Sequence, residues 1–438
     1  MGLSLSRALR LKPFSRIAFV GSGGKTTALF LLARQIKPVI VTASTHLSIS
    51  QIKLADQHFV INSLEDCDQI EDHLPAGVIL VTGPIMGDRT AGLSAEIFSW
   101  LDKYCDRHSL PMLIEADGSR QRPLKAPSDY EPVFPECVNH VVVVAGLSGF
   151  GKPLTQKWVH RPEFFASLSG LSPGELINPD DVVRVLLHPD GGIRNIPDNV
   201  RRDLIFNQAD SPVQQALVGR LARNMLSTYN SVISTSVAQE KTYATHVSTA
   251  GIILAAGESK RYGEPKQMLD WRGKPLIWHT TNSALEAGLS RVMVVAGADV
   301  QQINNALTGM PVEILHNPDW RSGQSSSVRV GLNALKRQTG AAIFLLCDQP
   351  QIPHTLIRSL VQHHAQSVSP IVAPLIDGQR GNPVLFDCSL FSDLMLLKGD
   401  AGGRQLFSRF PIFWLPWYDD RLNLDVDNLK DYQRLLRM

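Results

Sequence analysis

A run of small residues followed by two bases, near the middle of the chain, has the composition of a phosphate-binding loop. Leu254–Gly257 come directly after an apolar run, and Arg261 and Lys266 follow closely. Small residues let a ligand approach the backbone, so successive N–H groups of such a turn can donate to phosphate oxygens. The two bases add a planar and a point-like positive charge. A Gly-rich turn alone would be an ordinary surface turn, but the loop and its bases together predict a triphosphate site.

An aspartate stands where a metal ion for that triphosphate would be held. Asp348 follows the apolar run Ala342–Leu346, and α/β folds bind ligands at the carboxyl ends of their strands. Magnesium takes one or two carboxylates together with substrate phosphates. Asp348 supplies one carboxylate, and Asp425 or Asp427 supplies another. Alone, Asp348 would more often cap the helix expected after Pro353, but beside a phosphate loop the pattern favours the metal.

A second phosphate-loop pattern lies near the start of the chain. The residues 21–27, G-S-G-G-K-T-T, follow an apolar run and precede a helix-like segment, which is the context that a P-loop requires. Loop amides and the lysine would hold phosphates of ATP or GTP, and the first threonine would ligate Mg²⁺. The predicted binding residues are Gly21, Gly23, Gly24, Lys25, Thr26 and Thr27. The longer form of the motif would need glycine where this chain has Phe19, so the pattern predicts nucleotide binding and leaves hydrolysis open.

Two later patches fit a nucleotide site in the first half. Glu115 and Asp117 end an apolar run, so either can meet the metal or its water, and Asp117 is the predicted ligand. Asn207 and Asp210 are spaced like the N-K-x-D guanine reader of GTPases, with Gln208 in place of lysine. These two residues either read a base or only terminate a strand.

These residues need two α/β domains to position them. At 438 residues the chain is long for one core. Short, continuously apolar runs alternate with helical patterns, which favours parallel sheets covered on both faces. The polar stretch 237–248 reads as a linker between domains 1–236 and 249–438.

Composition narrows the class of protein. Apolar residues make up 44% and charged residues 19%, as in an ordinary globular chain. The formal charge is +2, from 43 basic and 41 acidic side chains, so nucleic acid is not an expected partner. The five cysteines are scattered without metal-ligand spacing, and no apolar run is long enough for a bilayer. A cytoplasmic protein without membrane association is expected.

The second half resembles the molybdenum cofactor cytidylyltransferases, of the MobA-like NTP transferase type. The resemblance covers residues 249–438 and rests on L-A-A-G-x-S-x-R-x-G-x-x-K at 254–266, D-Q-P at 348–350, and the stretches 317–327, 380–383 and 399–404. It implies a Rossmann-like, GT-A-like α/β fold that transfers CMP from CTP to molybdopterin and releases pyrophosphate. Related guanylyltransferases carry L-A-G-G at 254–257, which favours CTP. Tyr262 departs from the family, which usually has Met there.

The resemblance also implies roles for individual residues. Loop amides would hold base, ribose and phosphates, Arg261 and Lys266 would neutralise the leaving pyrophosphate, and Asp348, with Asp427, would hold Mg²⁺. The nucleotide-binding set is Leu254, Ala255, Ala256, Gly257, Ser259, Arg261 and Lys266. Other polar residues remain ambiguous between ligand contact and local capping or turn roles: Ser325–Ser327, Arg329, Arg380, Asn382, Asp400 and Arg404.

The first half resembles the selenium-dependent hydroxylase accessory proteins, over about residues 15–236. The motifs that carry this likeness are 21–27, 41–45, 115–127 and 151–154. It implies a P-loop NTPase-like domain in the maturation of molybdenum hydroxylases, with a hydroxylase apoenzyme as a possible partner. The leading hypothesis is therefore a cytidylyltransferase fused to a nucleotide-binding accessory domain. Alternatives are another phosphorylated acceptor, such as a sugar or isoprenoid phosphate, or a P-loop assembly module.

Overall fold

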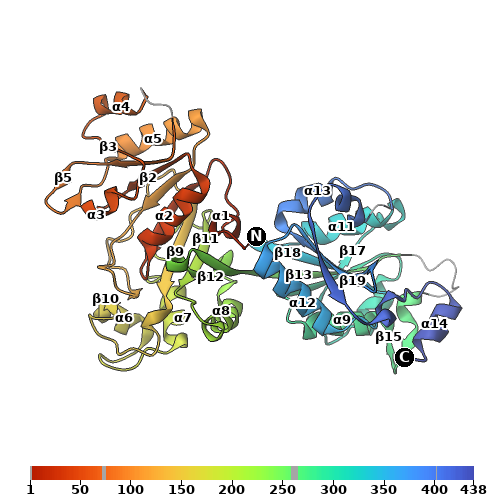
Figure 1. The fold of residues 1–438 in the computed structure, drawn as a ribbon. Helices are drawn as coiled ribbons and strands as arrows, with labels where there is room; N and C mark the ends of the chain where they lie inside the picture. Colours follow the sequence, from red (N-terminus) through yellow and green to blue (C-terminus); the bar gives the residue numbers. More distant parts are fainter. Residues whose placement is uncertain (1, 72–74, 258–264, 401) are drawn as a thin grey trace. The chain divides into compact units, whose positions relative to one another are not determined.

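A computed structural model describes residues 2–71, 75–257, 265–400 and 402–438, and these form two compact units, Met1–His246 and Val247–Met438 (Figure 1). The stretch 237–248 is regular rather than irregular, because it contains the 3₁₀ helix η3 and the start of strand β13. Alternate side chains there, such as Thr245 and Val247, are buried, as a strand requires. The division between the units falls inside β13.

Unit 1 is built on a parallel sheet with strand order β12-β11-β9-β1-β7-β2-β4-β3. Its strands are β1 (Arg16–Gly21), β2 (Val39–Ala43), β3 (Gln57–Val60), β4 (Val78–Thr82), β7 (Met112–Glu115), β9 (His140–Gly146), β11 (Arg201–Asn207) and β12 (Ser231–Ser236). Two small pairs stand apart: β5 (Ile85–Met86) with β6 (Arg89–Thr90), and β8 (Leu124–Lys125) with β10 (Val159–His160).

Helices cover both faces of this sheet, as the continuously apolar strands predict. Successive residues of β1 enter different cores, since Phe19 packs with α2 on one face and Ala18 packs with α5 and α8 on the other. The helices are α1 (Leu5–Ala8), α2 (Lys25–Ile36), α3 (Ile49–Ile52), α4 (Asp68–Glu71), α5 (Ala95–His108), α6 (Pro162–Ser169), α7 (Pro179–Leu187) and α8 (Pro212–Met225), with η1 (Glu65–Cys67), η2 (Leu147–Gly149) and η3 (Val237–Gln239).

Unit 2 has a mixed sheet, with strand order β17-β16-β13-β18-β21-β19-β22. Its strands are β13 (Lys241–Ala255), β16 (Arg291–Ala296), β17 (Glu313–His316), β18 (Thr339–Leu346), β19 (Ile371–Ile376), β20 (Gln379–Arg380), β21 (Val384–Asp387) and β22 (Ile412–Trp417), and β14 (Asp270–Trp271) pairs with β15 (Lys274–Pro275) outside the main sheet. The expectation of parallel sheets fails at β21, which runs antiparallel to both β18 and β19.

The helices of unit 2 again lie on two faces. One core contains side chains of α9, α10 and α12, and the other contains those of α11 and α13. The helices are α9 (Leu276–Glu286), α10 (Val300–Ala306), α11 (Gln324–Asn333), α12 (His354–Ser367), α13 (Phe391–Met395) and α14 (Leu429–Leu435), with η4 (Lys266–Met268), η5 (Trp320–Ser322), η6 (Cys388–Leu390), η7 (Gly403–Ser408) and η8 (Asp420–Asn423). In both units the predicted loops follow the carboxyl ends of central strands, β1 and β13.

Candidate functional site

In unit 2 a buried glutamine forms hydrogen bonds to the backbone of the loop after β13. Gln267 donates from Nε2 to the carbonyl oxygens of Ala255, at 3.1 Å, and Gly257, at 3.2 Å. Two backbone carbonyls are thereby tied down, which fixes the direction of the loop at its start. Leu254, the second-last residue of β13, lines a cleft. Ser259 and Arg261, predicted to contact nucleotide, lie outside the described residues.

The structure brings three of the predicted residues together beside that loop. Lys266 Nζ lies 2.6 Å from Asp348 Oδ2 and 3.2 Å from Asp427 Oδ1. Burial alone would lower the pKa of Lys266, but the Asp348 carboxylate raises it above its ordinary value. The backbone N–H of Val426 donates to the Asp348 carbonyl at 3.0 Å, which holds the 425–427 segment against the end of β18. This cluster of one cation and two carboxylates spans 162 residues of sequence.

The second oxygen of Asp348 is available for a ligand. Asp348 Oδ1 is buried and has no hydrogen-bond partner, which is costly unless something binds it. Asp348 does not cap α12, whose N-cap is Pro353. Within the described parts of the chain, no three acidic, histidine or cysteine side chains gather as a ready metal cage. One or two carboxylates completed by phosphates are nevertheless what Mg²⁺ takes.

Asp425, the alternative second ligand, points elsewhere. Its carboxylate accepts a hydrogen bond from Gln349 Nε2. Asp425 lines the cleft and forms no ion pair with Lys266. Burial, together with the nearby charge of Asp348, raises the pKa of Asp425. The geometry therefore places Asp427, and not Asp425, against the lysine.

The cleft next to this cluster has a volume of about 450 Å³ and an apolar floor. Side chains from β13, β18, β21, α11 and α13 form the floor: Leu254, Val328, Phe344, Leu346, Val384, Phe386 and Leu394. Asn382, Asp400 and Arg404 add polar groups at its wall, whereas Arg380 is exposed and does not line it.

The serines 325–327 have a structural role. They lie inside α11, whose N-cap is Gly323, so the capping interpretation is wrong. Asn317 Nδ2 donates to Ser326 Oγ at 2.8 Å and to Ser327 Oγ at 3.0 Å. Arg329 donates to the Leu397 carbonyl at 2.7 Å. Helix α11 ends at Asn333, before a turn.

In unit 1 the glycine loop after β1 is preformed. Gly24 has φ +108°, and a Cβ atom there would overlap the Asn207 side chain. That side chain donates from Nδ2 to the Gly23 carbonyl at 2.6 Å, and the Gly23 N–H donates to the Arg122 carbonyl at 2.9 Å. Helix α2 begins at Lys25, so its free N–H groups face the loop.

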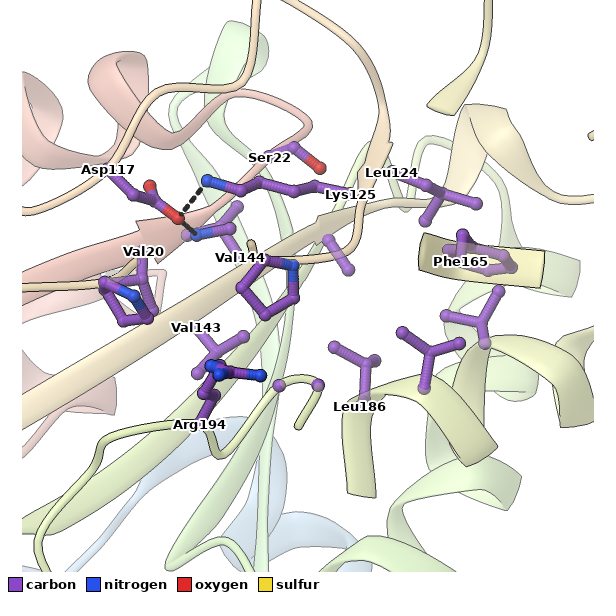
Figure 2. Close-up of a pocket in the computed structure, with 18 residues that line it drawn as sticks. Val20, Ser22, Asp117, Leu124, Lys125, Val143, Val144, Phe165, Leu186 and Arg194 are labelled. Atoms are coloured by element: carbon purple, nitrogen blue, oxygen red, sulfur yellow. Dashed lines mark hydrogen bonds and ion pairs between the residues drawn. The ribbon is translucent and has the colours of Figure 1, made fainter. Parts of the chain in front are cut away.

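Lys25 of this loop is part of a buried ion network. Lys25 contacts the Asp117 carboxylate, and Lys125 Nζ lies 2.7 Å from Asp117 Oδ2 and 2.9 Å from Glu131 Oε2. Burial opposes charge on both groups, but the attraction between them raises the pKa of Lys25 and lowers that of Asp117. Figure 2 shows Asp117 and Lys125 at one side of a small cavity of about 40 Å³ beside the loop.

The two predicted metal ligands of unit 1, Thr26 and Asp117, contact different groups in the structure. Thr26 Oγ1 donates to Glu115 Oε2 at 2.7 Å and accepts from Gln51 Nε2 at 3.3 Å. Asp117 is occupied by the two lysines and by the Gly21 N–H, at 2.9 Å. Glu115, rather than Asp117, therefore lies beside the threonine hydroxyl.

A large pocket lies above the P-loop. Of the candidate base-reading residues after β11, Gln208 lines this pocket, whereas Asn207 and Asp210 do not. Asn207 braces the loop, as described, and its Oδ1 accepts from the Val237 N–H at 3.0 Å. Gln208 lines the pocket above the loop, while the exposed Asp210 is 3.5 Å from Gln239 Nε2. The strand-ending interpretation of Asn207 and Asp210 fits these contacts better than guanine reading.

Comparisons with known proteins match each unit separately. A MobA-like NTP transferase domain model matches residues 251–412, and a YqeC protein model matches residues 17–163. The uncharacterized protein YqeC of Escherichia coli (strain K12) is 30% identical over 212 residues, which cover 46% of this chain and 79% of that protein. The chain joins a YqeC domain to a MobA-like NTP transferase domain.

Two further relatives are similar to part of this chain. The nicotine blue oxidoreductase of Paenarthrobacter nicotinovorans is 32% identical over 197 residues, or 42% of this chain and 95% of that protein. A probable molybdenum cofactor guanylyltransferase of Bacillus anthracis is 28% identical over 132 residues, or 30% of this chain and 64% of that protein. The MobA-like unit is thus a member of a nucleotidyltransferase family, in which one relative is named for a different reaction.

Sequence reasoning missed the residues that support the two loops. Gln267 in the MobA-like unit and Lys125 and Glu131 in the YqeC unit are each one polar residue among many along the chain. Their sequence signals are local: Gln267 follows Lys266, Lys125 lies within the motif 115–127, and Glu131 comes shortly after that motif. Along the described chain, no helix combines the length and apolar character needed to cross a membrane.

Proposed function

We propose that the MobA-like unit transfers CMP from CTP to the phosphate of molybdopterin, releasing pyrophosphate and forming molybdopterin cytosine dinucleotide for molybdenum hydroxylases. The observation that carries this proposal is the placement of Lys266 between Asp348 and Asp427 beside the loop after β13. A cation and two carboxylates at a phosphate loop suit transfer of a nucleotidyl group, because the reaction mainly needs alignment and charge neutralisation.

The residues of the unit divide this work. Backbone N–H groups of Ala255–Gly257 lie on the turn that receives the triphosphate, and Gln267 keeps that turn in place. Lys266 neutralises charge on the departing pyrophosphate, together with Arg261. Asp348 and Asp427 fit Mg²⁺, since Asp348 Oδ1 lacks a partner; the bound metal would supply further charge neutralisation at the phosphates. The acceptor phosphate is already anionic, so no strong base is required.

The choice of CTP is supported by Ala256. This residue is buried, and it stands where the resembling guanylyltransferases have glycine. A methyl group there reduces the space at the loop, which favours the smaller pyrimidine base. The cleft supports the acceptor, because its aromatic and aliphatic floor suits a flat heterocycle and Arg404 at its wall suits a phosphate.

For the YqeC unit we propose binding of ATP or GTP with Mg²⁺, in a cytoplasmic accessory role toward a molybdenum hydroxylase apoenzyme. Lys25 and the N–H groups at the start of α2 would hold phosphates, and Thr26 with Glu115 would hold the metal. Nucleotide turnover by the full chain, with and without an apo-hydroxylase, separates an NTPase from a binding module. If wild type and Lys25→Ala bind ATP and GTP equally, the P-loop has no part in binding.

A direct assay tests the transferase proposal. The full chain is incubated with molybdopterin and CTP or GTP, and pyrophosphate release and the dinucleotide product are measured. We expect CTP to be favoured over GTP by about tenfold or more, with no release when sugar or isoprenoid phosphates replace molybdopterin. A preference for GTP would refute the cytidylyl assignment and retain nucleotidyl transfer. Absence of pyrophosphate with every nucleotide, alongside oxidoreductase activity, would refute nucleotidyl transfer itself.

A further inference from the structure

The pocket above the P-loop of the YqeC unit is large and strongly basic. Its volume is about 830 Å³, against about 450 Å³ for the cleft of the MobA-like unit. Its cationic lining residues are Lys25, Arg89, Arg120, Arg122, Lys157 and Arg161, whereas the carboxylates among the described lining residues are Glu115 and Glu131. The pocket is therefore near the upper end of small-molecule sites in size and carries an excess of positive charge.

Both carboxylates in this pocket already have partners. Glu115 accepts from Thr26 and lies 3.5 Å from Lys25. Glu131 pairs with Arg161 at 2.7 Å and with the buried Lys125. Little negative charge remains to balance the other bases.

Three bases that line the pocket have no carboxylate partner in the described chain. They are Arg120, Arg122 and Lys157, which we call the basic rim. Arg120 and Arg122 lie on the loop after β7, and Lys157 lies just before β10. The two segments are joined by the β8–β10 pair and by the Leu124 N–H, which donates to the Trp158 carbonyl at 3.3 Å.

The basic rim adjoins the P-loop. The carbonyl oxygen of Arg122 accepts from the Gly23 N–H at 2.9 Å, and Ser22 Oγ donates to the Pro123 carbonyl at 3.0 Å. A phosphate bound at the rim would thus lie in the same pocket as the phosphates of a nucleotide on the P-loop.

The segment that carries Arg120 has a strained backbone. Arg120 and Gln121 both have left-handed backbone, with φ of +48° and +58°, and such residues cost about 1 kcal/mol or more each. His160 lies in the same pocket. Burial and the charges of Arg161, Lys125 and Arg120 lower its pKa to about 4.

We propose that the basic rim binds the phosphate group of a second small molecule, a phosphomonoester, beside the nucleotide on the P-loop. This inference rests on the nucleotide site proposed above. A phosphomonoester carries nearly two negative charges and three acceptor oxygens, which two guanidinium groups and an ammonium group can satisfy. The YqeC unit would then take two anionic ligands together, unlike a simple nucleotide switch.

Flavin mononucleotide is a suitable probe, because it is a fluorescent phosphomonoester and riboflavin is its phosphate-free counterpart. The full chain, saturated with a non-hydrolysable ATP analogue and Mg²⁺, is titrated with each. We expect riboflavin to bind about tenfold or more weakly than flavin mononucleotide, and inorganic phosphate to compete. The double variant Arg120→Ala/Lys157→Ala should lose about tenfold in affinity. Arg220→Ala, which removes one exposed charge from α8, should change it less than about twofold.

Several outcomes would overturn the proposal. One is equal binding of the two flavins, and another is unchanged affinity in the rim variant. A third is loss of binding in Arg404→Ala alone, which would place the probe in the cleft of the MobA-like unit. A fourth is the absence of saturable binding of flavin mononucleotide or phosphate up to about 5 mM. A repeat without nucleotide separates this result from the P-loop proposal, which fails only if the ATP analogue does not bind through Lys25.

Discussion

Both units place a lysine between carboxylates next to a phosphate loop, but only one of them buries the arrangement. In the YqeC unit, the side chains of Lys25 and Asp117 are 2% and 3% exposed. In the MobA-like unit, Lys266, Asp348 and Asp427 are 21%, 18% and 57% exposed. The same pairing of charges therefore has different surroundings in the two halves of the chain.

This difference in burial predicts that the Lys25 network contributes more to the stability of its unit than the Lys266 pairs do to theirs. Removing one partner of a buried ion pair leaves an uncompensated charge, which makes the Lys25 network a part of the stability of its unit. An ion pair near solvent contributes little, so Lys266 can leave its carboxylates when a nucleotide and its metal arrive. The unpartnered Asp348 oxygen agrees with that second role.

The largest expected effect is on the chemistry of the MobA-like unit. Asp348→Ala should lower kcat for nucleotidyl transfer by about 10³-fold, because it removes both the partner of Lys266 and the main metal-holding carboxylate. Asp419→Ala, at an exposed pair with Arg421, is the matched control and should leave kcat unchanged. Near-normal turnover by Asp348→Ala would remove this residue from the mechanism.

The two lysines should differ in their effect on folding. Lys25→Met should destabilise the YqeC unit by about 3 kcal/mol, since buried Asp117 and Glu115 lose a cation. Lys266→Met should cost its unit less than about 1 kcal/mol. Hydrogen exchange of the full chain in increasing denaturant measures the free energy of unfolding of both units in one experiment. Equal destabilisation by the two substitutions would contradict the contrast between a buried and an exchangeable lysine.

Acid should destabilise the YqeC unit through a partly buried histidine. Burial lowers the pKa of His246 to about 4 from an ordinary value of 6.5. Between these values the unfolded chain binds the extra proton, so stability is full above about pH 6.5 and falls as the pH approaches 4. We expect a loss of about 2 kcal/mol from this residue. His246→Asn should flatten the pH dependence measured by hydrogen exchange, while His316→Asn, at an exposed position, should not.

The smallest expected effect on kcat concerns the second carboxylate ligand of Mg²⁺, for which Asp425 and Asp427 are the two candidates. Asp427→Asn should lower kcat by about tenfold, because Asp427 is more exposed and farther from Lys266 than Asp348 is. Asp425→Asn should lower it less than about threefold, since that carboxylate is already bonded by Gln349. Steady-state rates at saturating CTP, across a range of Mg²⁺ concentrations, test the order. A larger loss of kcat in Asp425→Asn than in Asp427→Asn would make Asp425, and not Asp427, the second metal ligand.

Much of the fold was predictable from local pattern. Apolar runs such as Val78–Val81, Met112–Ile114 and Ile412–Leu415 are strands, within a few residues at their ends. The pattern of apolar runs does not indicate β3 or β12, because these strands contain partly exposed or polar residues. The antiparallel β21 was not predicted either, because strand direction depends on the path of the chain and not on the residues of the strand.

What the sequence alone determined is local: loops of small residues after apolar strands, a lysine within reach of each, and an acid at the end of a neighbouring strand. These follow from backbone sterics and burial, which act within a few residues. Only the tertiary structure decided that Thr26 meets Glu115 while Asp117 meets Lys25, and that Lys266 meets Asp427. Such pairings depend on which strands are neighbours in the sheet, and side chains so far apart in sequence are brought within a few ångströms only by the packing of the whole unit.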